Sequence, residues 1–161
     1  MPPPAPVAIL VFPETSASVV YGMVDLFASA GRDWQFVVAG EPGPQLFQSL
    51  LVGRSAGPVI VGNGVPIVVE RSFDDCPAAG LICVPEVNLP PGAPLTERFR
   101  DEIGWLRACH ARGATLATAC SGAMLLAEAG LLAGCDATTH PRDAAGAGQG
   151  PEIEIRCGIP R

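Results

Sequence analysis

Hydrophobic residues follow two different spacings along the amino-terminal part of the chain. Residues 7–12, VAILVF, form a continuous apolar run, which is typical of a strand covered on both faces. Between residues 16 and 30 the apolar side chains recur at helical spacing, with a Thr-Ser pair before them and Gly31 as a stop. Residues 34–40, WQFVVAG, predict a second strand. The opening pattern therefore predicts a β-α-β unit.

The second half of the chain repeats this alternation. An Asn-Gly turn signal within residues 57–70 predicts two short strands, although the rest of residues 40–79 shows no clear pattern. Residues 80–85, GLICVP, are a fully apolar strand, and a stripe from Leu95 to Cys109 or His110 predicts a helix that ends at Gly113. ATLATA at residues 114–119 and SGAMLLAEAGLL at 121–132 predict a further strand and helix.

Apolar strands that alternate with helices predict an α/β fold, with a parallel sheet sandwiched by helices. This pattern covers residues 1–140, whereas residues 141–161 predict an irregular tail with a short strand-like segment, PEIEIRC. Ligands of such sheets bind beyond the carboxyl ends of the strands. Three polar groups follow such ends and are candidate site residues: Glu14, Glu86 and Cys120.

The composition narrows the function classes. All ten basic residues are arginines, and 16 acidic residues give the 161-residue chain a formal net charge of −6. Because no basic cluster is present, we expect no direct nucleic-acid binding by this chain. No apolar run approaches the roughly 20 residues of a membrane span, and the start lacks a signal-peptide pattern, so we expect a cytoplasmic protein without membrane binding. The six cysteines show no C-x-x-C pair and no ligand-like partner histidine, which predicts reduced thiols and neither a metal site nor a disulfide framework. We also expect no cofactor.

Cys120 stands in TACSG, where a predicted strand turns into a predicted helix. A nucleophile on such a sharp turn needs small neighbours, and Ala119, Ser121 and Gly122 provide them. The helix amino terminus beneath the sulfur can stabilise a thiolate and cradle an oxyanion. Free cysteines are also among the most buried residues, so plain packing is the alternative interpretation.

Two further side chains could complete a site around this cysteine. His140, in ATTHP, could orient or activate a thiolate, and its alternative is a histidine at a strand end. Glu86 could point into the same crevice, and its alternative is a solvated loop carboxylate. The pattern alone leaves both choices open.

The stretches VFPETSASVVYGMVDLF, VPEVNLPPG and LATACSGAMLLAEAGLLAG, with the ATTHP that follows, resemble the DJ-1/PfpI family. More narrowly, they are similar to the amino-terminal domain of GlxA-type regulators of the AraC group. The resemblance covers residues 7–140 and implies a flavodoxin-like, class I glutamine amidotransferase-like fold. It implies that Cys120 is the nucleophile or redox-sensitive residue and that His140 is the matching histidine. The implied oxyanion donors are the Ser121 N–H and a loop N–H near Glu86 and Val87. Members of the family commonly dimerise, so a homodimer is compatible with the resemblance.

The chain departs from this family pattern at three places. Enzymatic members carry an acidic residue in the first helix that bonds the cysteine, and the matching position is Val19. Glu14 or Glu86 could substitute for this acid from a neighbouring loop. The loop after GLICVP is PEV where the family usually has Gly-Gly. After TTH the later family segments are not matched, so the chain looks truncated, and an uncovered sheet face would favour association.

These observations predict a small-molecule-sensing regulatory domain of a transcriptional regulator, with the DNA-binding module absent from this chain. The expected ligand is a small nitrogenous or carbonyl metabolite. The alternative is a cysteine-dependent hydrolase, hydratase or glyoxalase-like enzyme of the same family, with Cys120 as nucleophile and His140 as base. The valine at position 19 favours sensing, and the irregular tail leaves a non-functional truncated product as a third interpretation.

Overall fold

A five-stranded sheet forms the centre of the computed structural model, which describes residues 2–76, 78–90, 93–135 and 137. The strand order is β5-β2-β1-β6-β7, and all neighbouring strands are parallel. The strands are β1 (Ala5–Leu10), β2 (Phe47–Gly53), β5 (Arg71–Ser72), β6 (Leu81–Val84) and β7 (Thr115–Thr118).

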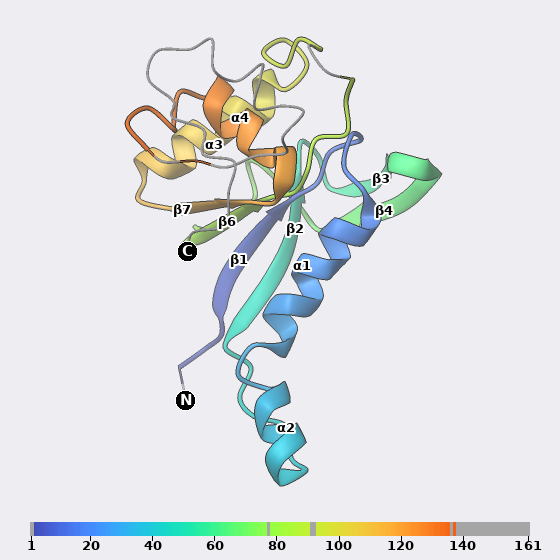
Figure 1. Ribbon diagram of the computed structural model, residues 1–161, viewed down its shortest axis with the longest axis vertical. Helices are drawn as coiled ribbons and strands as arrows, with labels where there is room; N and C mark the ends of the chain where they lie inside the picture. Colours follow the sequence, from blue (N-terminus) through green and yellow to red (C-terminus); the bar gives the residue numbers. More distant parts are fainter. Residues whose placement is uncertain (1, 77, 91–92, 136, 138–161) are drawn as a thin grey trace.

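Helices cover both faces of this sheet (Figure 1). The helix α1 (Ala17–Ser29) packs on one face, and α3 (Arg100–Ala111) and α4 (Ala123–Glu128) pack on the other. The predicted α/β fold is therefore confirmed.

The central strand β1 shows why its sequence is apolar without alternation. Val7, Ile9 and Val11 belong to the core under α1, whereas Ala8, Leu10 and Phe12 belong to the core under α3 and α4. All six side chains are buried. Because successive side chains of a strand point to opposite faces, a strand covered on both faces needs apolar residues at every position.

The predicted pair of short strands is also present. The strands β3 (Gly57–Val61) and β4 (Val65–Val69) pair antiparallel around the turn Gly62–Gly64, where Asn63 has a φ of 62°. The Gly62 N–H donates to the Thr15 carbonyl at 2.8 Å. This bond fastens the hairpin β3–β4 to the loop between β1 and α1.

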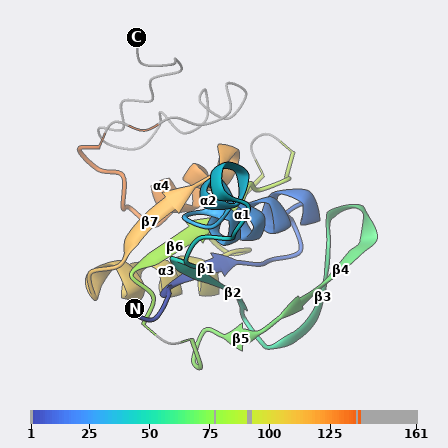
Figure 2. The same cartoon turned by 90° about the horizontal axis from the view of Figure 1, so that it is seen from below.

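The strand predicted at residues 34–40 is wrong, because this segment forms the helix α2 (Asp33–Ala39). A short apolar run does not by itself distinguish strand from helix. The position beside β1 is taken by β2, and Gly40, with a φ of 76°, ends the helix by donating its N–H to the Phe36 carbonyl at 2.9 Å. None of the residues of α2 is buried, and the helix projects from the end of the molecule away from the hairpin β3–β4 (Figures 1 and 2).

Three smaller differences concern element bounds. The strand β2 lies in the part of the chain where the pattern showed no strand besides the hairpin. The helix α3 begins at Arg100 rather than near Leu95, although Leu95 is buried and its carbonyl accepts the Phe99 N–H at 2.8 Å. The helix expected at 121–132 is a 3-10 turn at Cys120–Gly122 followed by the short α4. The predicted tail at 141–161 lies outside the described residues.

Within the described part of the chain, no helix is both long enough and apolar enough to cross a membrane.

Candidate functional site

Cys120 occupies a strained turn between β7 and α4. The preceding residue, Ala119, is extended, whereas Cys120 has a φ of 50° and begins the 3-10 turn. Left-handed backbone costs a residue with a side chain about 1–2 kcal/mol and is uncommon outside glycine, asparagine and aspartate. Cys120 is also exposed. A strained, exposed thiol at a strand-to-helix turn is the geometry of a nucleophile elbow.

Gly122 allows this turn to pack against the end of β6. A Cβ atom built on Gly122 would lie 2.5 Å from the Pro85 carbonyl oxygen and 2.6 Å from the Val84 carbonyl oxygen. The Val84 oxygen also accepts the Ala119 N–H at 2.9 Å, which holds it in place. Glycine is therefore required by close backbone approach, since its own φ of −56° suits any residue.

Ser121 fastens the elbow to the loop that follows β6. Its buried hydroxyl accepts the Val87 N–H at 2.9 Å and donates to the Val87 carbonyl at 3.0 Å. The resemblance implied a loop N–H near Glu86 and Val87 as an oxyanion donor. Of these two residues, Val87 donates its N–H to the Ser121 hydroxyl, a contact that joins the loop after β6 to the elbow.

Glu86 holds the start of α1. Its carboxylate accepts the Ser16 N–H at 2.8 Å, and the Thr15 hydroxyl donates to its other oxygen at 3.4 Å. Ser16 is the residue that precedes α1, so Glu86 satisfies an N–H at the start of this helix. The half-buried Glu86 is therefore not a solvated loop carboxylate, because residues before α1 bond both of its oxygens.

Glu14 lies at the carboxyl end of β1 among paired charges. Its carboxylate accepts a hydrogen bond from Arg98 Nε at 2.6 Å, and its backbone carbonyl accepts one from the Asn88 N–H at 2.8 Å. Nearby, Arg54 donates to both oxygens of Glu102, at 2.7 and 2.8 Å. This hydrogen-bonded carboxylate, only 1% exposed, raises the pKa of Arg54.

A cavity of about 280 Å³ opens beside these charges, at the carboxyl ends of β1 and β2. Glu14, Arg54, Arg98 and Glu102 are among its lining residues, and Cys120 is not. The carboxyl edge of the sheet therefore holds an exposed thiol at β7 and a charged hollow at β1 and β2. Between these two features, the Glu86 carboxylate accepts the Ser16 N–H, and the Asn88 N–H donates to the Glu14 carbonyl, which joins the loop after β6 to the loop between β1 and α1.

The arginines at this hollow were not candidates in the sequence. Arg54 directly follows β2, so the rule that selected Glu14, a polar residue after a strand, would also have selected Arg54 had that strand been identified. Arg98 lies outside every predicted strand end and precedes α3, and it reaches Glu14 across 84 residues of sequence. No local signal in the sequence indicates that contact.

The matching position for the family's acid, Val19, lies in the first turns of α1 and is half-buried. The two carboxylates that could substitute for it have other partners: Arg98 bonds Glu14, and Ser16 bonds Glu86. His140 lies outside the described residues. Of the predicted site residues, the structure thus places Cys120, Ser121, Glu86, Val87 and Glu14 at the carboxyl edge.

Three other cysteines have environments that disfavour reaction. Burial raises the pKa of the Cys83 thiol to about 11, and it raises those of Cys76 and Cys109 above their ordinary value. A thiol with a raised pKa holds little thiolate at neutral pH. Among the described residues, no three His, Cys, Asp or Glu side chains are grouped to hold a metal ion.

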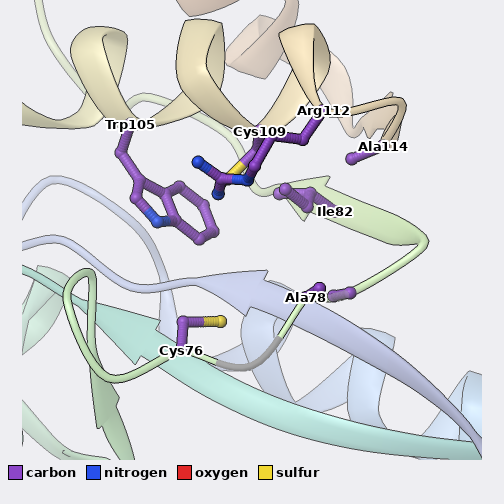
Figure 3. Close-up of a pocket in the computed structure, with 8 residues that line it drawn as sticks. Cys76, Ala78, Ile82, Trp105, Cys109, Arg112 and Ala114 are labelled. Atoms are coloured by element: carbon purple, nitrogen blue, oxygen red, sulfur yellow. The ribbon is translucent and has the colours of Figure 1, made fainter.

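Cys76 and Cys109 line a small cavity of about 40 Å³, together with Trp105 and Arg112 (Figure 3). The Arg112 guanidinium donates to Cys109 Sγ at 3.1 Å. Ala114, just before β7, also lines this cavity, which therefore lies at the amino ends of the strands. It is separated by the length of the sheet from Cys120, which follows the carboxyl end of β7.

Comparison with known proteins agrees with this architecture. The sequence pattern of the DJ-1/PfpI family matches residues 5–149, which is most of the chain. The chain belongs to the DJ-1/PfpI family. Isonitrile hydratase of Pseudomonas putida is 29% identical to it over 136 residues, which cover 83% of this chain and 51% of that protein. The chain thus spans about half the length of this curated relative.

Two solved structures share the fold of this DJ-1/PfpI chain. A ThiJ/PfpI family protein from Pseudomonas syringae has a TM-score of 0.67 and 26% identity, with 93% of this chain and 57% of that chain covered. An AraC family transcriptional regulator from Pseudomonas putida has a TM-score of 0.69 and 20% identity, with 96% of this chain and 77% of that chain covered. The second likeness, at this identity, concerns the fold alone.

Proposed function

We propose that this DJ-1/PfpI chain is a small-molecule-sensing regulatory domain, in which the crevice around Cys120 binds a small nitrogenous or carbonyl metabolite. One observation carries the proposal. The strained backbone of a nucleophile elbow is present, with an exposed Cys120 at a φ of 50°. Val19 stands at the position where the enzymatic members that the chain resembles carry an acid. An exposed thiol at the start of a helix suits ligand binding, and a valine in place of the acid disfavours catalysis by this thiol.

The contacts around the elbow also suit a sensor. Ser121 joins the elbow to the loop after β6, and Glu86 joins that loop to the start of α1. A ligand that displaces this loop would therefore act on two helices. Since the same fold occurs in a transcriptional regulator and in family members of other kinds, the fold itself does not choose between sensing and catalysis.

The alternative function is a cysteine-dependent hydrolase, hydratase or glyoxalase-like enzyme. The likeness to isonitrile hydratase favours it, and Cys120 would be the nucleophile, with His140 as base. A nucleophile of this kind needs a neighbouring group that accepts its proton. The apolar side chain of Val19 removes one such group, so we rank catalysis second.

Alkylation of Cys120 by iodoacetamide, followed against pH, separates the two functions. The variant Cys120→Ser identifies the signal of this thiol among the six cysteines. A rate that inflects well below the value of a free thiol, about 8.5, would favour the enzyme. A profile at or above that value, together with no conversion of an alkyl isonitrile into its formamide, is the result expected for a sensing domain.

The variant Val19→Asp gives a second, independent test. If Val19 is what separates the elbow from a catalytic site, an aspartate there should introduce conversion of an alkyl isonitrile into its formamide, and Cys120→Ser in the same variant should abolish it. The matched control is Val24→Asp, which places the same charge farther along α1. If Val19→Asp is as inactive as Val24→Asp, the valine is not what limits this thiol, and the argument for sensing fails.

A further inference from the structure

The cavity of about 280 Å³ at the carboxyl ends of β1 and β2 has both charged and apolar lining residues. We call it the β1–β2 hollow. Four of its lining residues are charged: Glu14, Arg54, Arg98 and Glu102. Four others are apolar: Val11, Phe12, Pro13 and Val59. Ligands of parallel α/β sheets bind at this edge. Because Cys120 does not line the β1–β2 hollow, a molecule bound there would occupy a site other than the elbow.

The exposed charge of the β1–β2 hollow is cationic, because its two carboxylates are buried and its two arginines are not. The side chains of Glu102 and Glu14 are 1% and 10% exposed, whereas those of Arg54 and Arg98 are 51% and 55% exposed. The four formal charges cancel, but the guanidinium groups are what an approaching molecule meets. The hollow therefore favours an anion over a cation.

Each of the two arginines is held by a carboxylate through one edge of its guanidinium group. Arg54 donates to Glu102 from Nε and Nη2, at 2.7 and 2.8 Å, and from Nη2 to the Arg98 carbonyl at 2.5 Å. Arg98 donates to Glu14 from Nε at 2.6 Å. Within the described residues, no hydrogen bond engages Nη1 of either arginine. Since a guanidinium group has five N–H donors in a fixed fork, each arginine keeps donors for a ligand while its own carboxylate fixes its position.

The apolar lining limits the kind of anion that suits the hollow. Pro13 is exposed and Val59 is half-buried, so both present apolar surface, and Val11 and Phe12 are buried. An inorganic phosphate has no apolar part to cover this surface, whereas the hydrocarbon chain of a carboxylic acid does. The volume of about 280 Å³ lies just below the range for drug-sized ligands, about 300–1,000 Å³. The ligand that fits is small, with a carboxylate at one end and a short apolar chain.

We propose that the β1–β2 hollow binds a short-chain monocarboxylate, with its carboxylate on Arg54 and Arg98 and its hydrocarbon chain against the apolar lining. Hexanoate is the probe, and titration calorimetry of the full chain should give saturable binding. Because both arginines are half-exposed, their contacts are weak, and we expect a dissociation constant in the millimolar range. Butyrate and acetate should bind progressively more weakly, by up to about fourfold for each methylene group lost.

Three further probes separate the two parts of the ligand. Inorganic phosphate has the charge without the chain, and 1-hexanol and hexylamine have the chain without the carboxylate. Each should bind more weakly than hexanoate by about tenfold or more, because each lacks one of the two contacts. Phosphate or hexanol that binds as tightly as hexanoate overturns the proposal, and so does a chain that binds no carboxylate saturably.

The variant Arg98→Met tests the charged part of the site and should weaken hexanoate binding by about tenfold or more. The matched control is Arg32→Met. Arg32 is also paired with a carboxylate, that of Asp33 at 2.7 Å, but it precedes α2 and does not line the hollow. This control should bind hexanoate as the unmodified chain does. If Arg98→Met does so too, the proposal is wrong.

Two measurements on the unmodified chain serve even if Arg98→Met fails to fold. Nitrogen-15 NMR resolves the Nε–H groups of the arginines, and hexanoate should shift the signals of two of the ten. Hexanoate should also leave the alkylation of Cys120 by iodoacetamide unchanged. Arginine signals that do not move, or hexanoate that protects Cys120, would place the ligand elsewhere and contradict the proposal. Because the elbow does not line this hollow, such a result leaves the proposed sensing function untouched.

Discussion

Replacing Gly122 with alanine should destabilise the protein, although Gly122 has backbone angles that alanine adopts readily. Its φ and ψ are −56° and −27°. At such a position alanine normally stabilises a protein by about 0.4–1 kcal/mol, because it reduces the freedom of the unfolded chain. Here the added Cβ would lie 2.5 and 2.6 Å from the carbonyl oxygens of Pro85 and Val84, nearly 1 Å inside ordinary contact.

The magnitude follows from these two opposing effects. Overpacking a well-packed site costs about 1–3 kcal/mol, and the obstructing atoms are backbone oxygens that cannot rotate away. One of them, on Val84, is further held by the Ala119 N–H. We therefore expect Gly122→Ala to lower the free energy of unfolding by about 1–2 kcal/mol. For a chain of this length the melting temperature should fall by roughly 2–8 °C.

Gly104 provides the matched control. It lies within α3, and a Cβ built there meets no atom within 4 Å. Gly104→Ala should therefore raise the free energy of unfolding by about 0.5–1 kcal/mol. Urea titrations of both variants, followed by circular dichroism, give the comparison. Equal or greater stability of Gly122→Ala than of the unmodified protein would refute the claim that close backbone approach fixes this glycine.

Three further predictions follow from buried groups, each measured by urea titration. Arg54→Met leaves the Glu102 carboxylate buried without its cation and should lower the free energy of unfolding by about 3 kcal/mol. The double variant Arg54→Met, Glu102→Met removes the buried charge as well and should recover most of this loss. Folding raises the pKa of Cys83 from 9.0 to about 11, so between these pH values the unfolded chain loses this proton while the folded chain keeps it. The free energy of unfolding should therefore fall by roughly 2–3 kcal/mol from about pH 9 to about pH 11 through this thiol, and Cys83→Val should abolish that part of the fall. Ser121→Ala removes the hydroxyl that bonds both the N–H and the carbonyl of Val87. It should lower the free energy of unfolding by about 1–3 kcal/mol and change the alkylation rate of Cys120.

The strands that are buried on both faces could be predicted from the sequence, because burial leaves no room for polar residues. Residues 7–12 and 80–85 are apolar throughout; the first run overlaps most of β1, and the second contains β6, next to β1 in the sheet. The strand β2 could not be recognised in the same way. Gln48 and Ser49 interrupt its apolar run, and its first half is only partly buried.

The strand wrongly predicted at α2 has a different cause. Residues 34–40 have the composition of a strand, and only their surroundings make them a helix. The sheet has no place for them beside β1, and Gly40 ends the segment in the left-handed conformation. Local propensity is a weak guide where the decision depends on which segment takes the neighbouring position.

At the site, the sequence indicated positions but not partners. Small residues around Cys120 predicted the elbow, and the observed φ of 50° agrees with it. The roles of Ser121 and Glu86 depend on contacts with residues 34 and 70 positions away, so no local pattern carries them. Side chains that follow strand ends can be placed at one edge of a sheet, but what they bond there is a property of the assembled fold.

Two separate demands meet at an elbow of this kind, the presentation of a thiol and the transfer of its proton. Presenting a thiol on a strained turn requires a close approach of backbones, which Gly122 allows, and a fixed neighbouring loop, which Ser121 holds. Using that thiol in catalysis requires in addition a group that takes its proton. In the enzymatic members that the chain resembles, an acid stands at the position that Val19 occupies on α1. The proposal of a sensing domain therefore depends on this one position, which is why the variant Val19→Asp is its sharpest test.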